Sequence, residues 1–597
     1  MTQNIRLSQF VITYGPGAIL EGEKGPRVIP LPNIGLFNVN KNLEPEFFEI
    51  SDQRITQGIL EGSRIFRLPS NAELGRSEDY YLYRTKPFPT WKLCLNNYHH
   101  KGNFSVLYSG NYCPVCKSKG MNRTEAIRFI TACPDGHMND VSWKYIVHEN
   151  NKQECHHKEW FKWYGGGGSL SGVEIICPKC NSKANLGKIY GRTWKCSGRY
   201  PERELLDEMP NFHECNKEAR IIQRQASNLR IPELITLFSV PPRYTKLHNL
   251  LQMRDIYNAL IVGEPESKKD LENIINKLVR NNLLSSSSAD EILSYSWEEL
   301  KRAIDDVLTP VGNSYHDLIT EEFHALIDAS YNGVPPVNGP QPKSPVIFEV
   351  DPNMTVKCSA PGGTKFRVTP VRRLRTVTVN KGYRREIGSD FKSKPVPIGF
   401  SDSVNTSWYP GVEFLGEGLF IMQEESDGTD SELSGKATDE WLKVYSDPSY
   451  YPEYVFRDPD IKEELHPLFV RWHTLSHLLI RSIAIEAGYS AASIRERIYI
   501  EHDESKNRGG ILLYASQPGT DGTLGGLIAL APNFQDIFDI AFEQLQTCSG
   551  DPLCRNSKFQ AGVYNGAACY NCLLLSETSC EHRNMWLDRN VLMENMP

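Results

Sequence analysis

Apolar residues recur with helical spacing in the central part of the chain, from about residue 228 to 330. In SKKDLENIINKLVRNNLL, the residues Leu271, Ile274, Ile275 and Leu278 follow the i, i+3, i+4, i+7 pattern of one buried helix face. Ser267, at the start of this segment, is a suitable N-cap because its hydroxyl can accept from unpaired backbone N–H groups. The segment SWEELKRAIDDVL repeats the pattern. We therefore expect a helical region here, followed by an exposed Pro- and Gly-rich connector at 332–345.

Helical and strand patterns alternate in the last 160 residues. Helices are predicted in HPLFVRWHTLSHLLIRSIAIEAG and FQDIFDIAFEQL, and strands in RIYIEHD and GGILLYASQPG. His473 and His477 lie four residues apart on the first helix, but Thr474 stands where a zinc-protease motif requires Glu. We predict a small α/β unit whose two histidines lie in its core or in an interface.

Two other regions show strand patterns. The first ninety residues contain short apolar runs broken by Pro and Gly, such as ITYGPGAIL and RVIPLP. The segment FRVTPVRRLRTVTVNKGYRREI predicts a pair of strands that turn at residues 380–382. Both regions are therefore expected to be rich in β-structure.

Composition and charge narrow the class of protein. The 597 residues are 40% hydrophobic and 23% charged, which indicates a globular protein of several domains. No segment approaches the roughly 20 apolar residues that cross a bilayer, and the N-terminus lacks the apolar run of a secretion signal. We expect a cytoplasmic protein with no membrane contact. The net charge of −7 argues against a wholly cationic surface but allows a local basic groove.

The 15 cysteines fall mainly into two groups, nine between positions 94 and 215 and five between 548 and 580. In a reducing cytoplasm, clustered thiols favour metal ligands over disulfides. Two CxxC knuckles stand in the first group, and each can aim two thiolates at one ion, which then needs two more ligands. The alternative is a pair of ordinary turns with unliganded thiols.

We expect two zinc sites in the first group. The first consists of Cys94, His99, Cys113 and Cys116, with His100 as the alternative to His99; the second consists of Cys177, Cys180, Cys196 and Cys215. Four further residues have no CxxC knuckle among them: Cys133, His137, His148 and Cys155. They form either a third metal site or a buried thiol with hydrogen-bonded histidines, and both interpretations stay open.

The second group predicts a closed structural site of Cys548, Cys554, Cys569 and Cys572. Four protein ligands leave no position for water or substrate, so such a site stabilises the fold and does not catalyse. Cys580 and His582 are spare candidates. The expected cofactor is Zn²⁺, in two to three structural sites.

The fold class predicted is therefore multidomain α+β. An N-terminal β-rich region at 1–90 precedes a zinc-knuckle region at 91–227, a helical region with its connector at 228–345, a β-rich basic region at 346–440 and a C-terminal α/β domain at 441–597 that a four-cysteine zinc site closes.

Basic residues crowd the predicted strands of the fourth region. The candidates for nucleic-acid binding are Arg372, Arg373, Arg375, Lys381, Arg384 and Arg385. Arginines on a strand pair can bind phosphates, because each offers a fork of donors. A solvated edge strand, or salt bridges to nearby acids, explains them equally well.

Motifs for common catalytic sites are missing. The sequence contains no phosphate loop, since SGKATD lacks both the first glycine and a hydroxyl after its lysine, and it contains neither G-x-S-x-G nor the kinase motifs. We therefore expect no catalytic residues.

Several motifs in order along the chain resemble a known family. ACPDGHMNDVSWKYIVH, EARIIQRQASNLRIP, VRRLRTVTV and WYPGVEFLGEGLF resemble the DrmB component of the DISARM anti-phage defence system. The segments from HTLSHLLI through YASQPGTDGTLGGL to CYNC and LDRN resemble the helicase-associated zinc-binding domain that closes MrfA-type DNA repair helicases. The resemblance implies that Cys548, Cys554, Cys569 and Cys572 bind the metal, and that a separate DrmA-like helicase or ATPase subunit is the partner on DNA.

The sequence is compatible with three functions. The first is a non-catalytic, zinc-stabilised subunit that binds the helicase partner and DNA. A pure protein scaffold without DNA contact is the second, and a metal-dependent nuclease with dispersed acidic residues and histidines is the third. The first agrees best with the missing phosphate loop, because the ATPase would lie on the partner chain.

Overall fold

The computed structural model describes residues 5–23, 25–36, 45–77, 81–100, 102–117, 123–149, 151, 155–165, 168–205, 208–240, 246–308, 314–333, 348–387, 393–401, 405–424, 433–451, 459–486, 488, 490–502, 507–517, 526–560, 563–576 and 579–597. These divide into two compact units. Unit 1 comprises Met1–Ile50, Ser63–Ile235 and Thr378–Val412, and unit 2 comprises Ser51–Gly62, Thr236–Val377 and Glu413–Pro597. Among the described residues, every helix is too short or too polar to cross a membrane.

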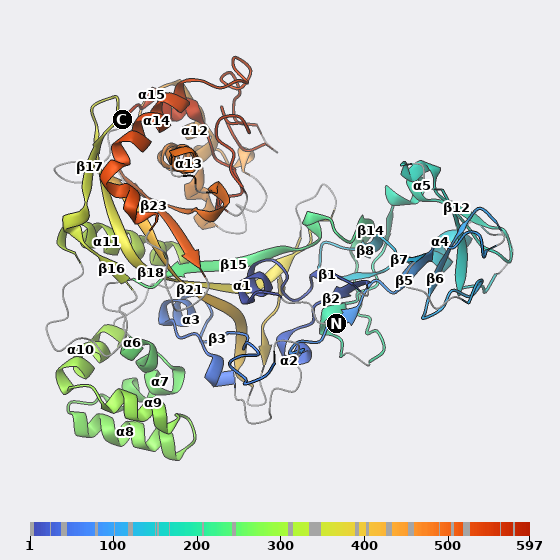
Figure 1. Cartoon of the computed structure of the whole chain (residues 1–597), viewed down its shortest axis with the longest axis horizontal. Coiled ribbons are helices and arrows are strands. Elements are labelled where there is room, and N and C mark those ends of the chain that lie inside the picture. Colours follow the sequence, from blue (N-terminus) through green and yellow to red (C-terminus); the bar gives the residue numbers. More distant parts are fainter. Residues whose placement is uncertain are drawn as a thin grey trace. The chain divides into compact units, whose positions relative to one another are not determined.

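Unit 1 contains three antiparallel sheets of short strands (Figure 1). The smallest consists of β1 (Ile19–Gly22), β2 (Gly25–Val28) and β4 (Lys86–Pro87). A six-stranded sheet has the order β12-β11-β10-β6-β5-β7, and its strands in sequence order are β5 (Trp91–Cys94), β6 (Ser105–Ser109), β7 (Thr124–Ala126), β10 (Trp160–Tyr164), β11 (Glu174–Ile176) and β12 (Lys183–Asn185). A four-stranded sheet has the order β13-β14-β8-β9, with β8 (Phe129–Ala132), β9 (Met138–Asp140), β13 (Thr193–Lys195) and β14 (Glu218–Gln223).

A small hydrophobic core supports these sheets. Two short helices, α4 (Trp143–His148) and α5 (Leu186–Tyr190), pack against β12, and Trp143 is fully buried in the same hydrophobic cluster as Phe161 and Ile175 of the sheet. The strands are only three to five residues long in the six-stranded sheet, so each buries few side chains. The strand ends, rather than the strands themselves, carry most of the cysteines.

The remaining elements of unit 1 are α1 (Leu7–Ile12), α2 (Pro32–Gly35), β3 (Arg64–Phe66), β19 (Val396–Pro397), β20 (Phe400–Ser401) and parts of three longer strands, β15 (Ile231–Phe238), β18 (Lys365–Arg384) and β21 (Ser407–Gln423). Strand β19 pairs antiparallel with β18, and β20 pairs antiparallel with β21, whereas β3 pairs parallel with β21.

The turn predicted at residues 380–382 is wrong, because β18 runs through them without interruption. Asn380 is fully buried, where its side-chain amide donates to the carbonyl oxygen of Val11 at 2.6 Å and its Oδ1 accepts from Gly382 N–H at 3.0 Å. Gly382 pairs with Pro397 of β19. The asparagine thus uses its hydrogen-bonding groups to fix an extended strand instead of a turn.

In unit 2, helices pack on both faces of the sheet that contains the remaining parts of β15, β18 and β21. Strands β16 (Phe348–Val350) and β17 (Val356–Ser359) pair with β18, while β23 (Asn507–Gln517) pairs with β21 and with β22 (Arg495–His502). Helix α11 (Tyr315–Asn332) places Phe323 against Phe420 and Tyr499 of this sheet. The short helix α3 (Gln53–Gly58) also belongs to this unit.

Helix α13 (Pro467–Glu486) lies at the centre of the largest core of the described residues (Figure 1). It contacts α12 (Lys436–Ser446), α14 (Phe534–Gln546), α15 (Arg589–Glu594), β22 and β23. Because residues 467–480 of this helix are surrounded on all sides, even their polar side chains are buried, whereas Ile485 and Glu486 at its end are exposed. The helices and strands predicted for the C-terminal α/β region are confirmed.

The central helices form a cluster of their own within unit 2: α6 (Lys246–Leu251), α7 (Arg254–Gly263), α8 (Lys268–Arg280), α9 (Ser286–Leu293) and α10 (Trp297–Leu308). Leu271, Ile275 and Leu278 are buried as predicted, and the hydroxyl of Ser267 accepts the N–H of Asp270 as the N-cap. Residues 334–345 of the expected connector lie outside the described residues.

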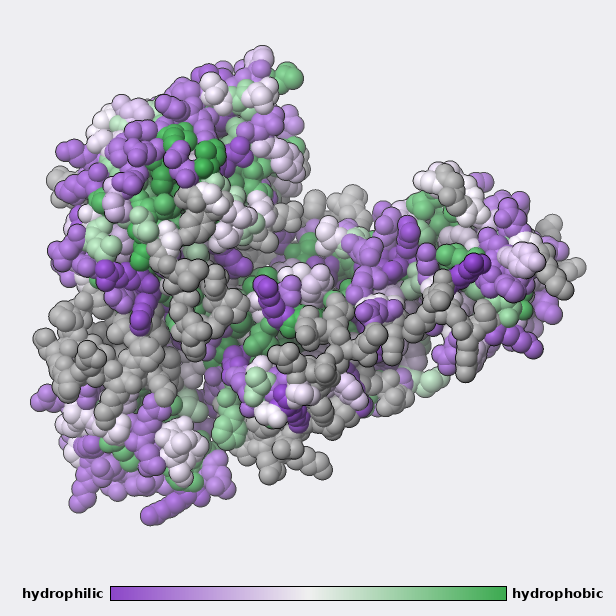
Figure 2. All heavy atoms as spheres, in the orientation of Figure 1, coloured by the Kyte–Doolittle hydropathy of each residue, from purple (hydrophilic) through white to green (hydrophobic). Residues whose placement is uncertain are grey.

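The predicted fold class is confirmed: the chain mixes helices and sheets, with N-terminal sheets, Cys clusters and a C-terminal group of Cys548, Cys554, Cys569 and Cys572. The face shown in Figure 2 is mainly hydrophilic, with hydrophobic side chains in small groups.

Candidate metal centres

Within the part of the chain that the structure describes, five groups of side chains have the composition and spacing of metal sites, and in each the potential ligand atoms all lie within 4.8 Å of one another. Cluster 1 is Cys94, His100, Cys113 and Cys116; cluster 2 is Cys133, His137, Cys196 and Cys215; cluster 3 is His148, Cys155, Cys177 and Cys180; cluster 4 is Cys548, Cys554, Cys569 and Cys572; cluster 5 is His473, His477, Glu496 and Cys580.

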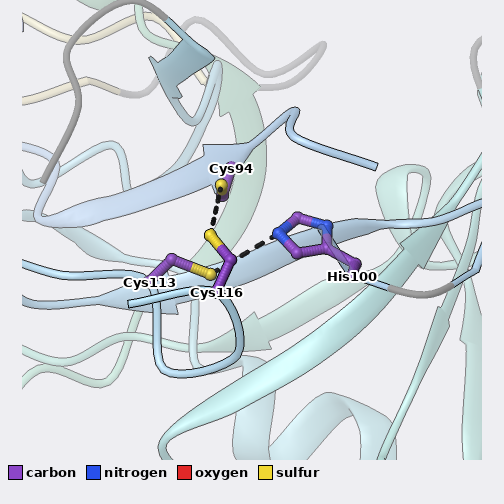
Figure 3. Close-up of side chains that lie close together, drawn as sticks. All are labelled: Cys94, His100, Cys113 and Cys116. Carbon is purple, nitrogen blue, oxygen red and sulfur yellow. Dashed lines mark hydrogen bonds between the residues drawn. The ribbon is translucent and has the colours of Figure 1, made fainter. Parts of the chain in front are cut away.

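Cluster 1 joins the end of β5 to the turns on either side of β6, and its four side chains point toward one another (Figure 3). The Sγ atoms of Cys94 and Cys116 lie 3.8 Å apart, and Sγ of Cys113 lies 3.6 Å from Nε2 of His100. Since Nδ1 of His100 donates to the carbonyl oxygen of Phe104 at 3.1 Å, its Nε2 carries the lone pair that faces the thiols.

The favoured ligand His99 is not the histidine that the structure places beside these thiols. His99 is exposed and packs edge-on against Tyr98, whereas the alternative, His100, is buried in the cluster. The two histidines are adjacent in a turn, so their side chains leave the backbone in different directions.

The two CxxC knuckles share one backbone geometry. Lys117 and Asn181, directly after the knuckles, have positive φ angles of 50° and 59°. Their N–H groups donate to the carbonyl oxygens of Cys113 and Cys177 at 2.9 and 3.1 Å. This tight turn aims both sulfurs of a knuckle to the same side, as a tetrahedral ion requires.

The set expected for the second knuckle is divided between two clusters. Cys177 and Cys180 lie at the β11–β12 turn of the six-stranded sheet, next to the end of α4 and to Cys155 before β10. Cys196 and Cys215 instead lie after β13 and before β14 of the four-stranded sheet. Sheet pairing, which the spacing of the cysteines does not reveal, therefore decides the partners.

Cluster 3 contains an unpartnered ring nitrogen. His148 Nδ1 donates to the carbonyl oxygen of Lys144 at 2.7 Å, while its Nε2 is buried and makes no hydrogen bond with any described residue. The Sγ atoms of Cys155 and Cys177 lie 3.9 Å apart. Burial raises the pKa of Cys177 to about 11; burial acts in the same direction on Cys180, but hydrogen bonds with Ser182 hold its pKa down at about 6. A buried nitrogen lone pair beside a thiolate fits a cation.

Cluster 2 lies at one end of the four-stranded sheet. Cys133 Sγ is 3.3 Å from Nδ1 of His137, whose ring packs on Tyr200 with centroids 4.3 Å apart. The N–H of Gly198 donates to Cys196 Sγ at 3.3 Å, and a side chain at Gly198 would collide with the backbone of His213. A hydrogen bond from Cys133 lowers the pKa of Cys196 to about 4, which favours a thiolate there. These four residues supply a ligand set that spacing alone did not predict.

Cluster 4 contains the four C-terminal cysteines expected to lie together. Sγ of Cys569 lies 3.5 Å from that of Cys548 and 3.7 Å from that of Cys572, and the sulfurs of Cys554 and Cys572 are also 3.7 Å apart. Tetrahedral zinc with thiolate bonds of about 2.3 Å separates its sulfurs by roughly 3.7 Å. Burial raises the pKa of Cys572 to about 11, so a cation is needed to keep all four sulfurs ionised.

Cys580 and His582, the spare candidates for the C-terminal metal site, lie in different environments. His582 is an ion-pair partner of Glu464, with Nδ1 3.2 Å from the carboxylate, and does not replace a ligand of cluster 4. Cys580 lies in cluster 5 with His473 and His477, the two histidines that were expected in a core or interface. Their four-residue spacing was visible in the sequence, but nothing connected it with Glu496 or Cys580.

The basic residues of β18 differ in exposure. Arg375 is buried and contacts Glu413 at 2.8 Å, and Arg385 is fully buried, where it donates to the carbonyl oxygens of Gly136 and Leu229 at 2.8 Å. Arg384 pairs with Glu233 at 2.7 Å, and Lys381 is half-buried.

Arg372 and Arg373 retain the most exposure among these candidates, with 42% and 54% of their side-chain surface accessible and Glu349 3.6 Å from each. A phosphate could reach these two guanidinium groups, whereas the buried arginines hold the fold.

Comparisons with known proteins match two regions of the chain and, in one case, most of its length. Residues 6–231, which include clusters 1 to 3, match a domain of unknown function (DUF8724), and residues 475–573, which include cluster 4, match the MrfA Zn-binding domain. The chain is 26% identical over 541 residues to the DISARM protein DrmB of Bacillus paralicheniformis, covering 85% of this chain and 89% of that protein.

A solved structure of the DUF1998 helicase MrfA bound to DNA overlaps at 10% identity, 34% of this chain, 22% of that chain and a TM-score of 0.18, which is too little to show a shared fold. The predicted resemblance to DrmB, and to the zinc-binding domain of MrfA, is confirmed by the sequence comparisons.

Proposed function

We propose that this chain is a non-catalytic, zinc-stabilised subunit of an anti-phage defence complex. In this function it binds a helicase-like ATPase partner of the DrmA type and helps that partner engage foreign DNA in the cytoplasm. The observation that carries the proposal is the 26% identity to DISARM protein DrmB along 85% of the chain.

The chemistry of clusters 1 to 4 supports a structural role for the metal. Each cluster offers four protein ligand atoms within 4.8 Å of one another, so an ion bound there has no open position for water or substrate. Zinc suits these sets because Cys and His are its preferred ligands and it carries no redox chemistry. Zinc at these clusters would hold strand ends together and leave ATP hydrolysis to the partner chain.

Co-purification tests the partner. The full-length chain, co-expressed with a tagged helicase encoded beside it, is expected to elute with that helicase in a fixed ratio, and the chain alone is expected to show no ATP turnover. ATP hydrolysis by the pure chain, or its complete separation from the helicase, would contradict the proposal.

The exposed arginines test DNA contact. In the complex, the double variant Arg372→Glu/Arg373→Glu is expected to weaken DNA binding at least about tenfold and to reduce the salt dependence by about two charges. The matched control is Lys277→Glu/Arg280→Glu, the same change of charge on two exposed positions of α8. Equal DNA affinity for both double variants and the wild type would contradict DNA contact through β18.

A pure scaffold is the second candidate, and the burial of Arg375 and Arg385 favours it. It predicts that the complex forms normally while neither double variant changes DNA affinity. Titration of a labelled duplex at several salt concentrations therefore distinguishes the two functions.

A further inference from the structure

Cluster 5 draws its members from three segments of unit 2 that lie far apart in sequence. His473 and His477 stand on α13, Glu496 stands on β22, and Cys580 lies in the loop before α15. The first three side chains are 0% exposed and Cys580 is 5% exposed. The region matched by the MrfA Zn-binding domain, 475–573, leaves out both His473 and Cys580. The cluster is thus distinct from the four cysteines of cluster 4.

The ligand atoms converge on one point. His473 Nε2 lies 3.0 Å from Glu496 Oε1 and 3.3 Å from Cys580 Sγ, and His477 Nε2 lies 3.1 Å from the same carboxylate oxygen. Bonds of about 2.0 to 2.3 Å in a tetrahedral zinc site place ligand atoms roughly 3.3 to 3.7 Å apart. Small side-chain rotations therefore bring the four atoms to coordinating distances.

The orientation of His477 requires either a proton or a metal ion between its Nε2 and Glu496. Nδ1 of His477 is 2.9 Å from the carbonyl oxygen of Leu573, and a carbonyl only accepts, so Nδ1 carries the proton. In the neutral ring, Nε2 then presents a lone pair to a carboxylate oxygen that also has only lone pairs. Two acceptors at 3.1 Å repel each other unless a proton or a metal ion lies between them.

Protons alone leave other groups of the cluster poorly satisfied. They would place an imidazolium in a fully buried position. Cys580 Sγ, in addition, accepts two backbone N–H groups, from His582 and Asn584, each at 3.3 Å. Two such donors stabilise a thiolate rather than a thiol.

The same sulfur contact recurs in two other clusters. The N–H two residues after the cysteine donates to Sγ at 3.3 Å at Cys196, at Cys548 and at Cys580. Charge adds a second argument, because a carboxylate and a thiolate buried together carry two negative charges. One divalent cation neutralises both and occupies the lone pairs of both imidazoles.

We propose that His473, His477, Glu496 and Cys580 bind a Zn²⁺ ion as a second, closed metal site of the C-terminal region. The hydroxyl of Ser476 donates to the other carboxylate oxygen, and the carbonyl of Leu573 orients His477. Leu573 directly follows Cys572 of cluster 4, so one peptide links the outer shell of the proposed site with a thiol of cluster 4. The ion is structural, since all four positions are filled by protein and water is excluded.

Metal content of the purified full-length chain tests this site. Inductively coupled plasma mass spectrometry is expected to show about one zinc per chain fewer in Cys580→Ser and in Glu496→Gln than in the wild type. Cys358→Ser is the control, because Cys358 is a buried thiol outside all five clusters, and it is expected to keep the full content. Equal zinc content in Glu496→Gln, Cys580→Ser and the wild type would overturn the proposal.

A second measurement does not depend on whether the variants fold. An anomalous difference map from wild-type crystals, recorded above and below the zinc edge, is expected to show a peak between the four ligand atoms. A map with peaks at cluster 4 and none at cluster 5 would overturn the proposal independently of the variants, and it would leave the proposed function standing.

Discussion

The region of clusters 1 to 3 and the C-terminal region of unit 2 hold cysteine clusters on very different supports. In the first, strands of three to six residues surround a small core, and the thiols occupy the ends of almost every hairpin. In the second, residues 467–480 of α13 are buried on all sides within the largest core of the described residues, and cluster 4 lies at the edge of this core. At the proposed zinc sites, metal would therefore replace missing hydrophobic burial in the first region and add to abundant burial in the second.

Zinc removal is expected to have the largest effect, and an unequal one. Structural zinc contributes about 10 to 16 kcal/mol to small sites, which matches or exceeds the 5 to 15 kcal/mol of a typical domain. A strong chelator should therefore unfold residues 91–223 while most of α13 and β22 remains protected. Hydrogen exchange followed by peptide mass spectrometry measures this. Equal loss of protection in both regions would contradict the claim that residues 91–223 depend on zinc more than the C-terminal core does.

Arg497 tests what stabilises the C-terminal region apart from metal. Its buried guanidinium contacts Glu322 at 3.0 Å and Glu581 at 2.9 Å. Arg497→Met leaves the fully buried Glu322 without this partner, so we expect a loss of about 3 to 5 kcal/mol in the free energy of unfolding. Arg495→Met, two residues earlier on β22, is the control and should cost less than about 1 kcal/mol. Denaturant titration at constant zinc compares the two variants.

Low pH should destabilise the C-terminal core through a partly buried histidine that is not a ligand of any cluster. Burial, with His502 stacked beside the ring, lowers the pKa of His466 to about 4, and the Leu468 N–H donates to its Nδ1. Below its ordinary pKa of about 6.5, the unfolded chain takes up a proton that the folded chain refuses, so stability falls as the pH drops from about 6.5 to 4. The full loss is about 3 kcal/mol.

Replacement of this ring should remove that part of the acid sensitivity. We expect His466→Asn to show a shallower fall in the free energy of unfolding between about pH 6.5 and 5 than the wild type, with metal loss common to both proteins. Parallel curves for the two proteins would assign the whole acid effect to the metal ligands.

The smallest effect is expected at Arg373. Its side chain is 54% exposed and lies 3.6 Å from Glu349, and surface pairs of this kind contribute about 0 to 1 kcal/mol. Arg373→Ala should shift the unfolding midpoint by less than about 2 °C in thermal melts. A larger shift would mean that this position belongs to the fold, which would weaken its use as a probe of DNA contact.

Local features of the fold were accessible from the sequence because they depend on neighbours along the chain. The face of α8 and its Ser267 cap follow from helical periodicity, and the turns of both CxxC knuckles follow from their spacing. Cluster 4 was also predictable, since its four cysteines lie within 25 residues of sequence.

Features that depend on tertiary pairing were not accessible. Which histidine of the adjacent pair faces cluster 1 depends on the turn after β5, and the exchange of partners between clusters 2 and 3 depends on which strands share a sheet. Cys580 meets His473 across 107 positions, a separation that no local pattern encodes. The turn predicted at residues 380–382 does not form, because the usual preference of Asn380 for turns is overridden by a buried hydrogen bond of its side-chain amide to Val11.

Cluster 3 is nested inside cluster 2 along the chain, since His148, Cys155, Cys177 and Cys180 all fall between His137 and Cys196. Cys180, the last ligand of cluster 3, therefore leaves the ribosome before Cys196 and Cys215 of cluster 2. If each proposed ion binds as soon as its ligands emerge, Cys177 and Cys180 are occupied before Cys196 and Cys215 can compete for the same ion. A refolding chain, which presents all its thiols at once, lacks this order.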